Sequence, residues 1–152
     1  MNQIYYVDVL VIRPHDGGFE ILMARRADGL YMGGTWQLIS GGLEPGETAW
    51  QAALRELQEE TALIPDEFYR LSTLSNFYRP DNDSLYTAPM FCAMVAEDAT
   101  VTINAEHTAF AWVDVAAANE RLMWPSDREA LAEVRSVILG DGLAKEFMQI
   151  PL

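Results

Sequence analysis

Residues 41–63 read GGLEPGETAWQAALRELQEETAL, and this stretch decides both the fold and the site. A glycine-rich loop at 41–46 leads into a segment without a helix breaker, in which Ala, Leu, Gln and Glu dominate. Thr48 suits the N-cap or the first turn of a helix, because its hydroxyl can accept a hydrogen bond from a free backbone N–H. The stretch therefore predicts a loop followed by a helix over 48–61.

The predicted helix has two faces. One is a mostly apolar stripe at helical spacing, formed by Trp50, Ala53, Leu54, Leu57 and Thr61. The other carries Glu56, Glu59 and Glu60, which fall within an arc of about 100°. Like charges at this spacing destabilise a helix by roughly 0.2–0.5 kcal/mol per pair, and Arg55 is the only basic residue of the segment. We therefore predict that a cation binds the three carboxylates; a solvated acidic face is the alternative.

The chemistry of the stretch favours a divalent cation together with a polyphosphate. Hard cations take carboxylate, carbonyl and water oxygens, and Mg²⁺ is usually held by a few carboxylates plus substrate phosphates. The glycines of the preceding loop allow the backbone to approach a ligand closely. We therefore expect Mg²⁺ or Mn²⁺ as the cofactor.

The whole stretch resembles the signature of the Nudix hydrolases: Gly, five residues, Glu, seven residues, then Arg-Glu-aliphatic-any-Glu-Glu-any-Gly-aliphatic. The residues that match in register are Gly41, Glu47, Arg55, Glu56, Leu57, Glu59, Glu60 and Leu63. Ala62 departs from the pattern, because the family usually has glycine there, and alanine is strained if φ must be positive. A match of this length is far more specific than a lone glycine-rich loop.

The resemblance implies that the three helical glutamates are metal ligands, and it adds two further ligands. One is the backbone carbonyl of Ser40, just before the signature. The other is a glutamate from a later loop, which we assign to Glu106 because it precedes His107 and an aromatic strand with Trp112. A surface glutamate in a loop is the alternative reading of Glu106.

The catalytic roles are assigned to Glu56, Arg55 and Glu59. Arg55 would orient Glu56 or Glu59 through a charge-assisted hydrogen bond. The general base is expected to be Glu56, with Glu106 as the second choice. Both are also expected metal ligands, and a carboxylate already bound to metal is a poorer base. Glu47 is expected to steady the junction of loop and helix.

Substrate choice rests on shorter resemblances. Segments 36–41, 106–112 and 126–130, together with Ala62, are similar to the branch that cleaves dATP-like nucleotides and dihydroneopterin triphosphate to pyrophosphate and a monophosphate. The alternatives are a Nudix hydrolase of dinucleoside polyphosphates, ADP-ribose or oxidised nucleotides, an inactive nucleotide-sensing Nudix domain, and a structural acidic protein.

Four residues are candidates for contacts with that substrate: Arg25, Trp36, Tyr78 and Arg79. An arginine at a strand end can hold phosphate, and residues at strand–loop junctions often touch ligands. Ordinary packing and solvation are the alternatives for all four.

Composition limits the partners. The 152 residues suit a single domain over 1–152, and the net charge of −13 argues against binding a nucleic acid polymer. A small nucleotide or pterin triphosphate remains compatible, because bound cations reverse the local charge. The sequence has no run of about 20 apolar residues and no signal-peptide pattern at its start, so we expect no membrane contact and a cytoplasmic location.

Hydrophobic patterns predict the remaining elements. Strands are expected at 4–12, 19–24, 36–40, 69–78, 85–95 and from 110, and helices at 115–122 and 126–139. We expect Asp114 to cap the first of these helices, a capping box of Ser126 and Glu129 to open the second, and Pro89 to mark an edge strand or a bulge. Together these predict an α+β fold, and the resemblance implies a Nudix-type α/β/α sandwich with a mixed, partly barrelled sheet. The apolar tail at 143–152 would dock on this chain or on a second subunit, as in a homodimer.

Overall fold

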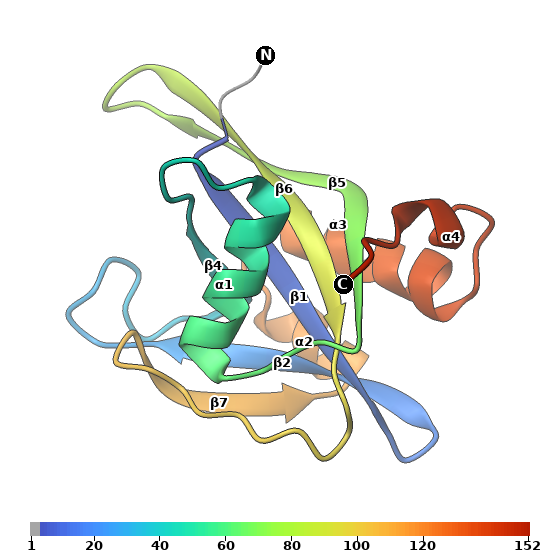
Figure 1. Ribbon diagram of the computed structural model, residues 1–152. Helices are drawn as coiled ribbons and strands as arrows, with labels where there is room; N and C mark the ends of the chain where they lie inside the picture. Colours follow the sequence, from blue (N-terminus) through green and yellow to red (C-terminus); the bar gives the residue numbers. More distant parts are fainter. Residues whose placement is uncertain (1–3) are drawn as a thin grey trace.

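A seven-stranded mixed sheet forms the centre of the structure, a computed structural model that describes residues 4–152 (Figure 1). Its strands are β1 (Tyr6–His15), β2 (Gly18–Arg26), β3 (Trp36–Gln37), β4 (Ile39–Gly42), β5 (Glu67–Arg79), β6 (Ser84–Met94) and β7 (His107–Val113). The main order is β3-β2-β1-β6-β5, with β4 beside β1 and β7 beside β2. β1 and β6 run parallel, whereas β1 pairs antiparallel with β2 and β4, which makes the sheet mixed.

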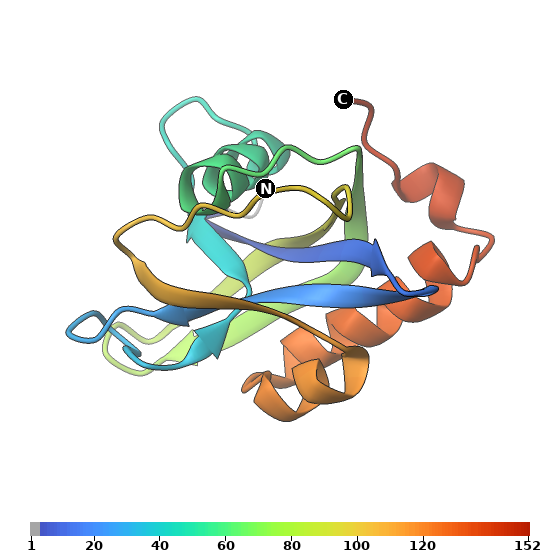
Figure 2. The same ribbon diagram turned by 90° about the horizontal axis from the view of Figure 1, so that it is seen from below.

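Helices cover both faces of the sheet (Figure 2). α1 (Ala49–Thr61) lies on one face. The other face carries α2 (Val115–Arg121), α3 (Pro125–Glu133) and the π-helix η1 (Val134–Leu139), and α4 (Lys145–Met148) follows. The predicted α+β class and the α/β/α sandwich with a mixed sheet are therefore confirmed.

The alternation of side chains along β1 separates two cores. Val7, Val9 and Val11 pack into a cluster that includes Leu57 of α1. The intervening Leu10 and Ile12 pack into a second cluster that includes Leu131 of α3. Successive side chains of a strand point to opposite faces, so Asp8 shares the α3 side of the sheet with this second cluster.

The prediction that Trp50 belongs to the buried stripe of α1 is wrong, because its side chain is 38% exposed. The helix instead buries Ala52, Ala53, Leu57, Glu60 and Thr61. Ala49 and Ala52 of the first turn still pack against the core, so Trp50 lies on the solvent side of that turn. Among the helical acids, burial singles out Glu60.

Pro89 lies in β6, which pairs with β1 on one side and β5 on the other, so the edge-strand alternative is wrong. The bulge alternative is confirmed, but the irregularity falls on the partner strand. The register of β5 shifts between Arg70 and Leu74, and Leu74 is the residue opposite Pro89. A proline cannot donate to the ladder, and the neighbouring strand bends where that bond is missing.

One helix cap is confirmed and one is wrong. Asp114 caps α2, with its Oδ1 accepting a hydrogen bond of 2.8 Å from the backbone N–H of Ala117. The predicted capping box of Ser126 and Glu129 does not form, because α3 begins one residue earlier, at Pro125, and Trp124 is its N-cap. Proline is favoured at the first helical position, which moves Ser126 into the first turn.

The C-terminal tail docks on β5 of its own chain. Gln149 forms an antiparallel bridge with Tyr69, and the backbone N–H of Ile150 donates to the carbonyl of Phe68 at 2.8 Å. Within residues 4–152, none of the helices is long and apolar enough to span a membrane.

α1 ends in a left-handed residue that is not glycine. Ala62, at the position where the signature usually has glycine, has φ 61° and ψ 13°, and its N–H donates to the carbonyl of Gln58. This conformation places Cβ close to the carbonyl oxygen, which costs about 1–2 kcal/mol in a residue other than glycine.

Replacing Ala62 with glycine should raise the free energy of unfolding by about 0.5–1 kcal/mol, because the relief of strain exceeds the added entropy of the unfolded chain. Urea denaturation would measure the change. Ala132→Gly in α3 is the matched control and should destabilise by roughly the same amount, since Ala132 lies inside a helix. A destabilised Ala62→Gly protein would contradict the strain argument.

Candidate active site

The loop before α1 is held by local hydrogen bonds. Thr48 is the N-cap and forms a capping box with Gln51, in which the backbone N–H of Thr48 donates to Gln51 Oε1 at 3.0 Å. The Glu47 carboxylate accepts a hydrogen bond of 2.9 Å from the backbone N–H of Glu44. These bonds fix the loop against the first turn of the helix.

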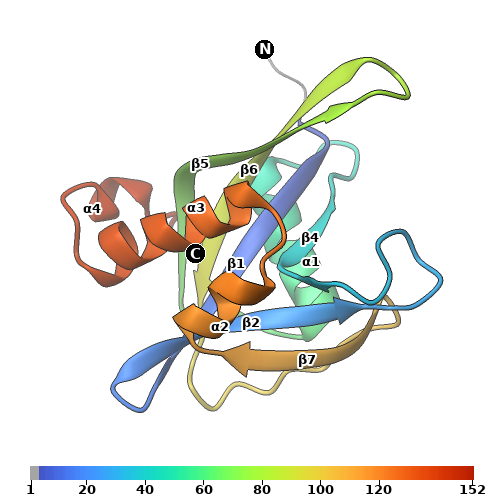
Figure 3. The ribbon, with the colours of Figure 1, turned by 180° about the vertical axis from the view of Figure 1, so that it is seen from behind.

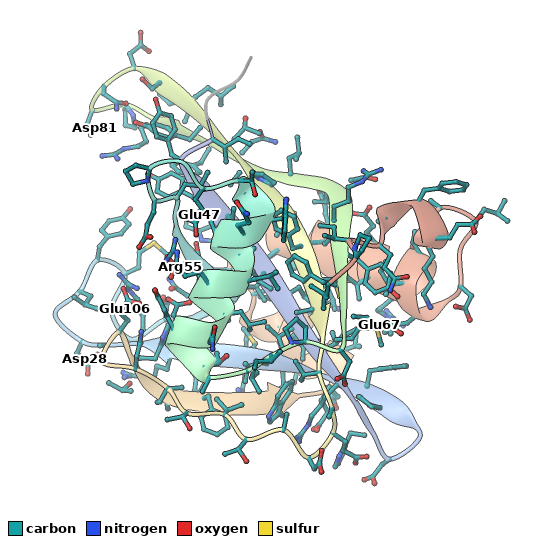
Figure 4. The ribbon with its side chains drawn as sticks, in the orientation of Figure 1. Asp28, Glu47, Arg55, Glu67, Asp81 and Glu106 are labelled. Carbon is teal, nitrogen blue, oxygen red and sulfur yellow. The ribbon has the colours of Figure 1, made fainter. Side chains whose placement is uncertain are left out.

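Arg55 connects the loop to the glutamates of the helix. Its Nε and Nη2 donate to the two carboxylate oxygens of Glu47 at 2.8 and 2.9 Å. Its Nη1 donates to Glu56 at 2.7 Å and to Glu59 at 3.2 Å, and Nη2 also reaches the carbonyl of Gly42 at 2.8 Å. The Glu47 carboxylate raises the pKa of Arg55, so this guanidinium remains charged. Figure 4 shows Glu47 and Arg55 on the same side of α1 as Glu106.

Gly41 leaves the space that the Glu56 side chain occupies. A Cβ atom built on Gly41 would lie 2.1 Å from Glu56 Cδ and 2.4 Å from its Oε1. Glu56 is thereby set against β4 and held by Arg55 from the other side. Glycine at this position is required for the position of the carboxylate.

Replacing Gly41 with alanine should lower kcat/KM by about 10²-fold, because displacing a catalytic group by about 1 Å costs that much. The fold should survive, since the clash is with the end of a flexible side chain. Steady-state kinetics with a thermal melt would test this. Gly18→Ala is the control, because a Cβ there meets only the backbone oxygen of His15, at 3.7 Å, and its φ, like that of Gly41, is not positive. Full activity of the Gly41→Ala protein would show that Glu56 need not lie against Gly41.

Glu60 is the most deeply buried of the predicted ligands. It is 1% exposed, and its Oε2 has no hydrogen-bond partner within residues 4–152. Burial raises the pKa of Glu60 to about 9, with further contributions from Glu106, which lies within hydrogen-bonding reach, and from Glu56. The nearby backbone of Ser40 opposes this rise in the pKa. An orphan buried carboxylate oxygen beside two other carboxylates is the donor set that a divalent cation satisfies.

Burial also raises the pKa of Glu56, and the charges of Glu59 and Glu106 add to this effect against the opposing Arg55. Glu56, Glu60 and Glu106 therefore lie close enough for their charges to interact, and the backbone of Ser40 lies beside Glu60. Their role as metal ligands stays a prediction. Glu59 is the outlying member, because its side chain is 53% exposed and turned to Arg55. The chain positions a group of acids from α1 and from the loop before β7.

A second acidic group lies at the β1–β2 turn and was not predicted as a site. His15, Asp16 and Glu97 place ligand atoms within 4.8 Å of one another, a spacing that the signature carboxylates do not reach. All three are at least partly exposed, and exposed acidic groups are common without a bound ion. The wider spacing at α1 suits ions that keep several waters and also contact phosphate.

Two of the four predicted substrate contacts, Arg25 and Trp36, face each other on the neighbouring strands β2 and β3. Arg25 at the end of β2 donates to Thr108 at 2.9 Å and to Asp28 at 3.2 Å. Trp36 in β3 packs against the core on the α3 side, with the guanidinium of Arg121 5.2 Å from its ring centroid. Trp36 is half-buried, which is consistent with core packing.

The other two lie in the β5–β6 hairpin, whose tip projects beyond the sheet (Figure 1). The Tyr78 hydroxyl donates to Asp83 at 2.8 Å, and Arg79 pairs with Asp81 at 2.6 Å. Their polar contacts are thus with acids of the hairpin itself. A substrate role for these two residues stays a prediction.

Comparison with known proteins identifies the family. The profile of the NUDIX domain matches residues 4–134, most of the chain, and it covers both the signature and Glu106. The chain belongs to the Nudix family.

Individual relatives agree on the domain and differ in their names. A Myxococcus xanthus protein named octanoyltransferase is 38% identical over 128 residues, 82% of this chain but 35% of that protein, so the chain spans about a third of this relative. The dihydroneopterin triphosphate diphosphatase of Escherichia coli K12 is 30% identical over 140 residues, 84% of this chain and 90% of that enzyme. The crystal structure of a Caenorhabditis elegans Ap4A hydrolase superposes with a TM-score of 0.75 at 19% identity, covering 91% of this chain and 99% of that one.

Proposed function

We propose that this protein hydrolyses a phosphoanhydride bond in a nucleoside triphosphate-like substrate, of the dATP or dihydroneopterin triphosphate type, and releases pyrophosphate and a monophosphate. The observation that carries the proposal is the proximity of Glu56, Glu60 and Glu106, with a buried Glu60 oxygen that has no hydrogen-bond partner among the described residues 4–152. The similarity to the Escherichia coli diphosphatase over most of both chains supports the substrate type.

The residues of the chain would divide the work as follows. Glu56, Glu60 and Glu106, with the carbonyl of Ser40 and with Glu59 from the rim, would hold Mg²⁺ or Mn²⁺. The bound ions would stabilise the negative charge that develops on the phosphate oxygens.

Glu56 would accept the proton of the attacking water, and its raised pKa brings it closer to the range in which a carboxylate is an effective base. Arg55 would keep the Glu56 carboxylate oriented through the 2.7 Å hydrogen bond. Gly41 provides the space in which that carboxylate lies. These three residues together fix the position of the proton acceptor.

A substrate panel tests the proposal. The purified chain with Mg²⁺ should release pyrophosphate and the monophosphate from dATP or dihydroneopterin triphosphate, and EDTA should abolish turnover. Product identification matters, because release of phosphate alone, or turnover of dinucleoside polyphosphates only, would exclude this substrate type. Tight nucleotide binding without turnover would support the sensing alternative instead.

Magnesium should stabilise the protein through Glu60, and more strongly at alkaline pH. Without metal, the folded pKa of about 9 lies above the ordinary 4.5, so the folded chain holds a proton that the unfolded chain has released. The free energy of unfolding of the metal-free protein should therefore fall as pH rises from about 5 to about 9. Binding requires the deprotonated carboxylate, so Mg²⁺ at about 100 times its Kd, which adds about 2.7 kcal/mol, should restore about half of the loss.

Calorimetric melts at about pH 6 and about pH 8.5 would measure this dependence. In Glu60→Gln, the fall with pH should shrink and the gain from Mg²⁺ should largely disappear. Glu129→Gln, at an exposed position of α3, is the matched control and should behave as the unaltered protein. A magnesium gain that persists in Glu60→Gln would remove Glu60 from the ligand set.

A further inference from the structure

The β5–β6 hairpin carries an apolar strip on the α1 side of the sheet. The arm of this hairpin, residues 74–89, projects past the α1 layer and the α3 layer alike (Figure 1 and Figure 3). Phe91 of β6 packs into the core on the α1 side, so the alternate residues 89, 87 and 85 point to that side too. Their partners on β5 complete the strip, whose cross-strand pairs are Leu74 with Pro89, Asn76 with Thr87, and Tyr78 with Leu85.

Three large side chains of the strip are exposed to solvent. Leu74 is 44% exposed, Tyr78 58% and Leu85 73%. Exposed hydrophobic residues that are scattered singly are normal on a monomer, whereas contiguous ones mark binding surfaces. Here they are contiguous, because opposite residues of an antiparallel pair lie about 4.5–5.5 Å apart and successive pairs on one face about 7 Å apart.

A groove of about 450 Å³ opens at the end of the strip that is nearer the sheet. Its apolar lining includes Ala49, Trp50, Pro89, Phe91, Ile150 and Pro151, and Arg70 adds a guanidinium. Trp50, the residue of α1 that is exposed against the helical pattern, therefore forms one wall of a recess. The recess is large enough to hold a leucine side chain.

Opposite charges mark the two ends of the strip. Arg70 lies opposite Phe91, which follows Thr87 by four residues along β6, and Asp83 precedes Thr87 by four residues. At about 3.3 Å per residue, each charge lies about 13 Å from the Asn76–Thr87 pair. The Arg70 guanidinium donates to a backbone carbonyl at 3.4 Å, and neither Arg70 nor Asp83 forms an ion pair within residues 4–152.

The charge of the chain restricts where two copies can meet. Two copies that each carry a net charge of −13 repel each other over most of their surface. The residues of the strip carry no charge, and at the tip of the arm Arg79 pairs with Asp81 at 2.6 Å. The strip is therefore a surface on which a second copy meets little repulsion.

We propose that the strip binds the strip of a second copy of this chain. The two-fold axis runs between the two Asn76–Thr87 pairs, perpendicular to the strands. It places Leu85 of each copy over Pro89 of the other copy, where the groove receives the leucine side chain. The most exposed apolar residue of the strip thus fills the recess beside Trp50.

The same axis pairs the charges at the two ends. Arg70 and Asp83 lie at equal distances on opposite sides of the axis, so Arg70 of each copy meets Asp83 of the other copy. The contact is isologous, because the same surface is used on both subunits, and it closes after two copies. The inference is independent of the proposed function.

Sedimentation velocity over about 1–300 µM protein should show a monomer–dimer equilibrium with a Kd on the order of 10 µM, as expected for a small interface. In Leu85→Asp the Kd should rise by about 30-fold or more, because the dimer would bury a carboxylate in an apolar groove. The fold should survive, since Leu85 is largely exposed, and a thermal melt would verify this. Leu143→Asp, at a residue 97% exposed outside the strip, is the matched control and should leave the Kd unchanged.

A charge reversal tests the two ends of the strip. Arg70→Glu should raise the Kd by about 10-fold, because it sets two acids against each other at both ends. Arg135→Glu, at an exposed position of η1, changes the net charge equally and should have little effect on the Kd.

A cross-link tests the position of the axis. Packed sheet faces lie about 10 Å apart, so a bismaleimide of about that length should join two copies of Asn76→Cys through the new thiol. Cys92, the only native cysteine, is fully buried and should not react. Ser136→Cys, exposed on η1, is the control and should give no linked dimer.

Three results would overturn the inference. A monomer at every concentration would leave the strip to a different partner. A dimer that persists in Leu85→Asp, or that is lost in Leu143→Asp, would place the interface elsewhere on the molecule. Absence of a linked dimer with Asn76→Cys, at concentrations where the unaltered protein is dimeric, would exclude the two-fold arrangement.

Discussion

Replacing Glu56 with glutamine should lower kcat by about 10³-fold, because removal of a general base typically costs between about 10² and 10⁴. Glutamine keeps the shape of the side chain and can still accept the hydrogen bond from Arg55, so the fold and the loop should persist. The lost property is the ability to take a proton. The acidic limb of the pH–rate profile should disappear with it.

Glu120→Gln, on the exposed side of α2, is the control for this substitution and should leave kcat unchanged. Calorimetric titration with Mn²⁺ separates the two roles of Glu56. Unchanged affinity with lost turnover identifies a base, whereas lost affinity identifies a ligand. A Glu56→Gln protein that keeps more than about a tenth of kcat would pass the base assignment to Glu106.

Replacing Arg55 with lysine should lower kcat/KM by about 10²-fold and reduce Tm, although the charge is kept. The planar guanidinium binds Glu47 with two nitrogens and reaches Glu56 and the carbonyl of Gly42 at the same time. A lysine ammonium is a single point donor and cannot span these groups. The loop and Glu56 should therefore lose their common support.

Arg135→Lys, at an exposed position of η1, is the matched control and should alter neither activity nor Tm. Glu47→Gln should reproduce part of the Arg55→Lys loss, since it weakens the same paired contact from the other side. Full activity of Arg55→Lys would mean that the positive charge alone is needed, and that the planar guanidinium with its several donors is not.

The parts of the fold that could be predicted are those that local sequence determines. The helix expected over 48–61 begins after its Thr48 cap and ends at Thr61, and Asp114 caps α2 as expected. The signature glutamates could be placed because their spacing on one helix fixes their relative directions. Glu106 required the family resemblance, and the structure brings it to Glu60 as that resemblance implies.

The errors arise where two local signals compete or where distant segments meet. Ser126 has the sequence of a cap, but Pro125 takes the first helical position. Pro89 is typical of an edge strand, yet β6 has β5 on one side and, from Met90 onward, β1 on the other. The position of Asp8 on the α3 side of the sheet could not be predicted, because it depends on where the later helix α3 packs against β1.

The docked C-terminal tail covers part of the outer edge of β5, which could otherwise pair with another chain. β5 ends the main strand order, so its outward backbone groups would form a template for another extended chain. Gln149 and Ile150 occupy part of that template through their pairing with Tyr69 and Phe68. Loss of the last few residues would therefore expose unpaired backbone groups along β5. The protein would then self-associate at high concentration, even with the catalytic carboxylates intact.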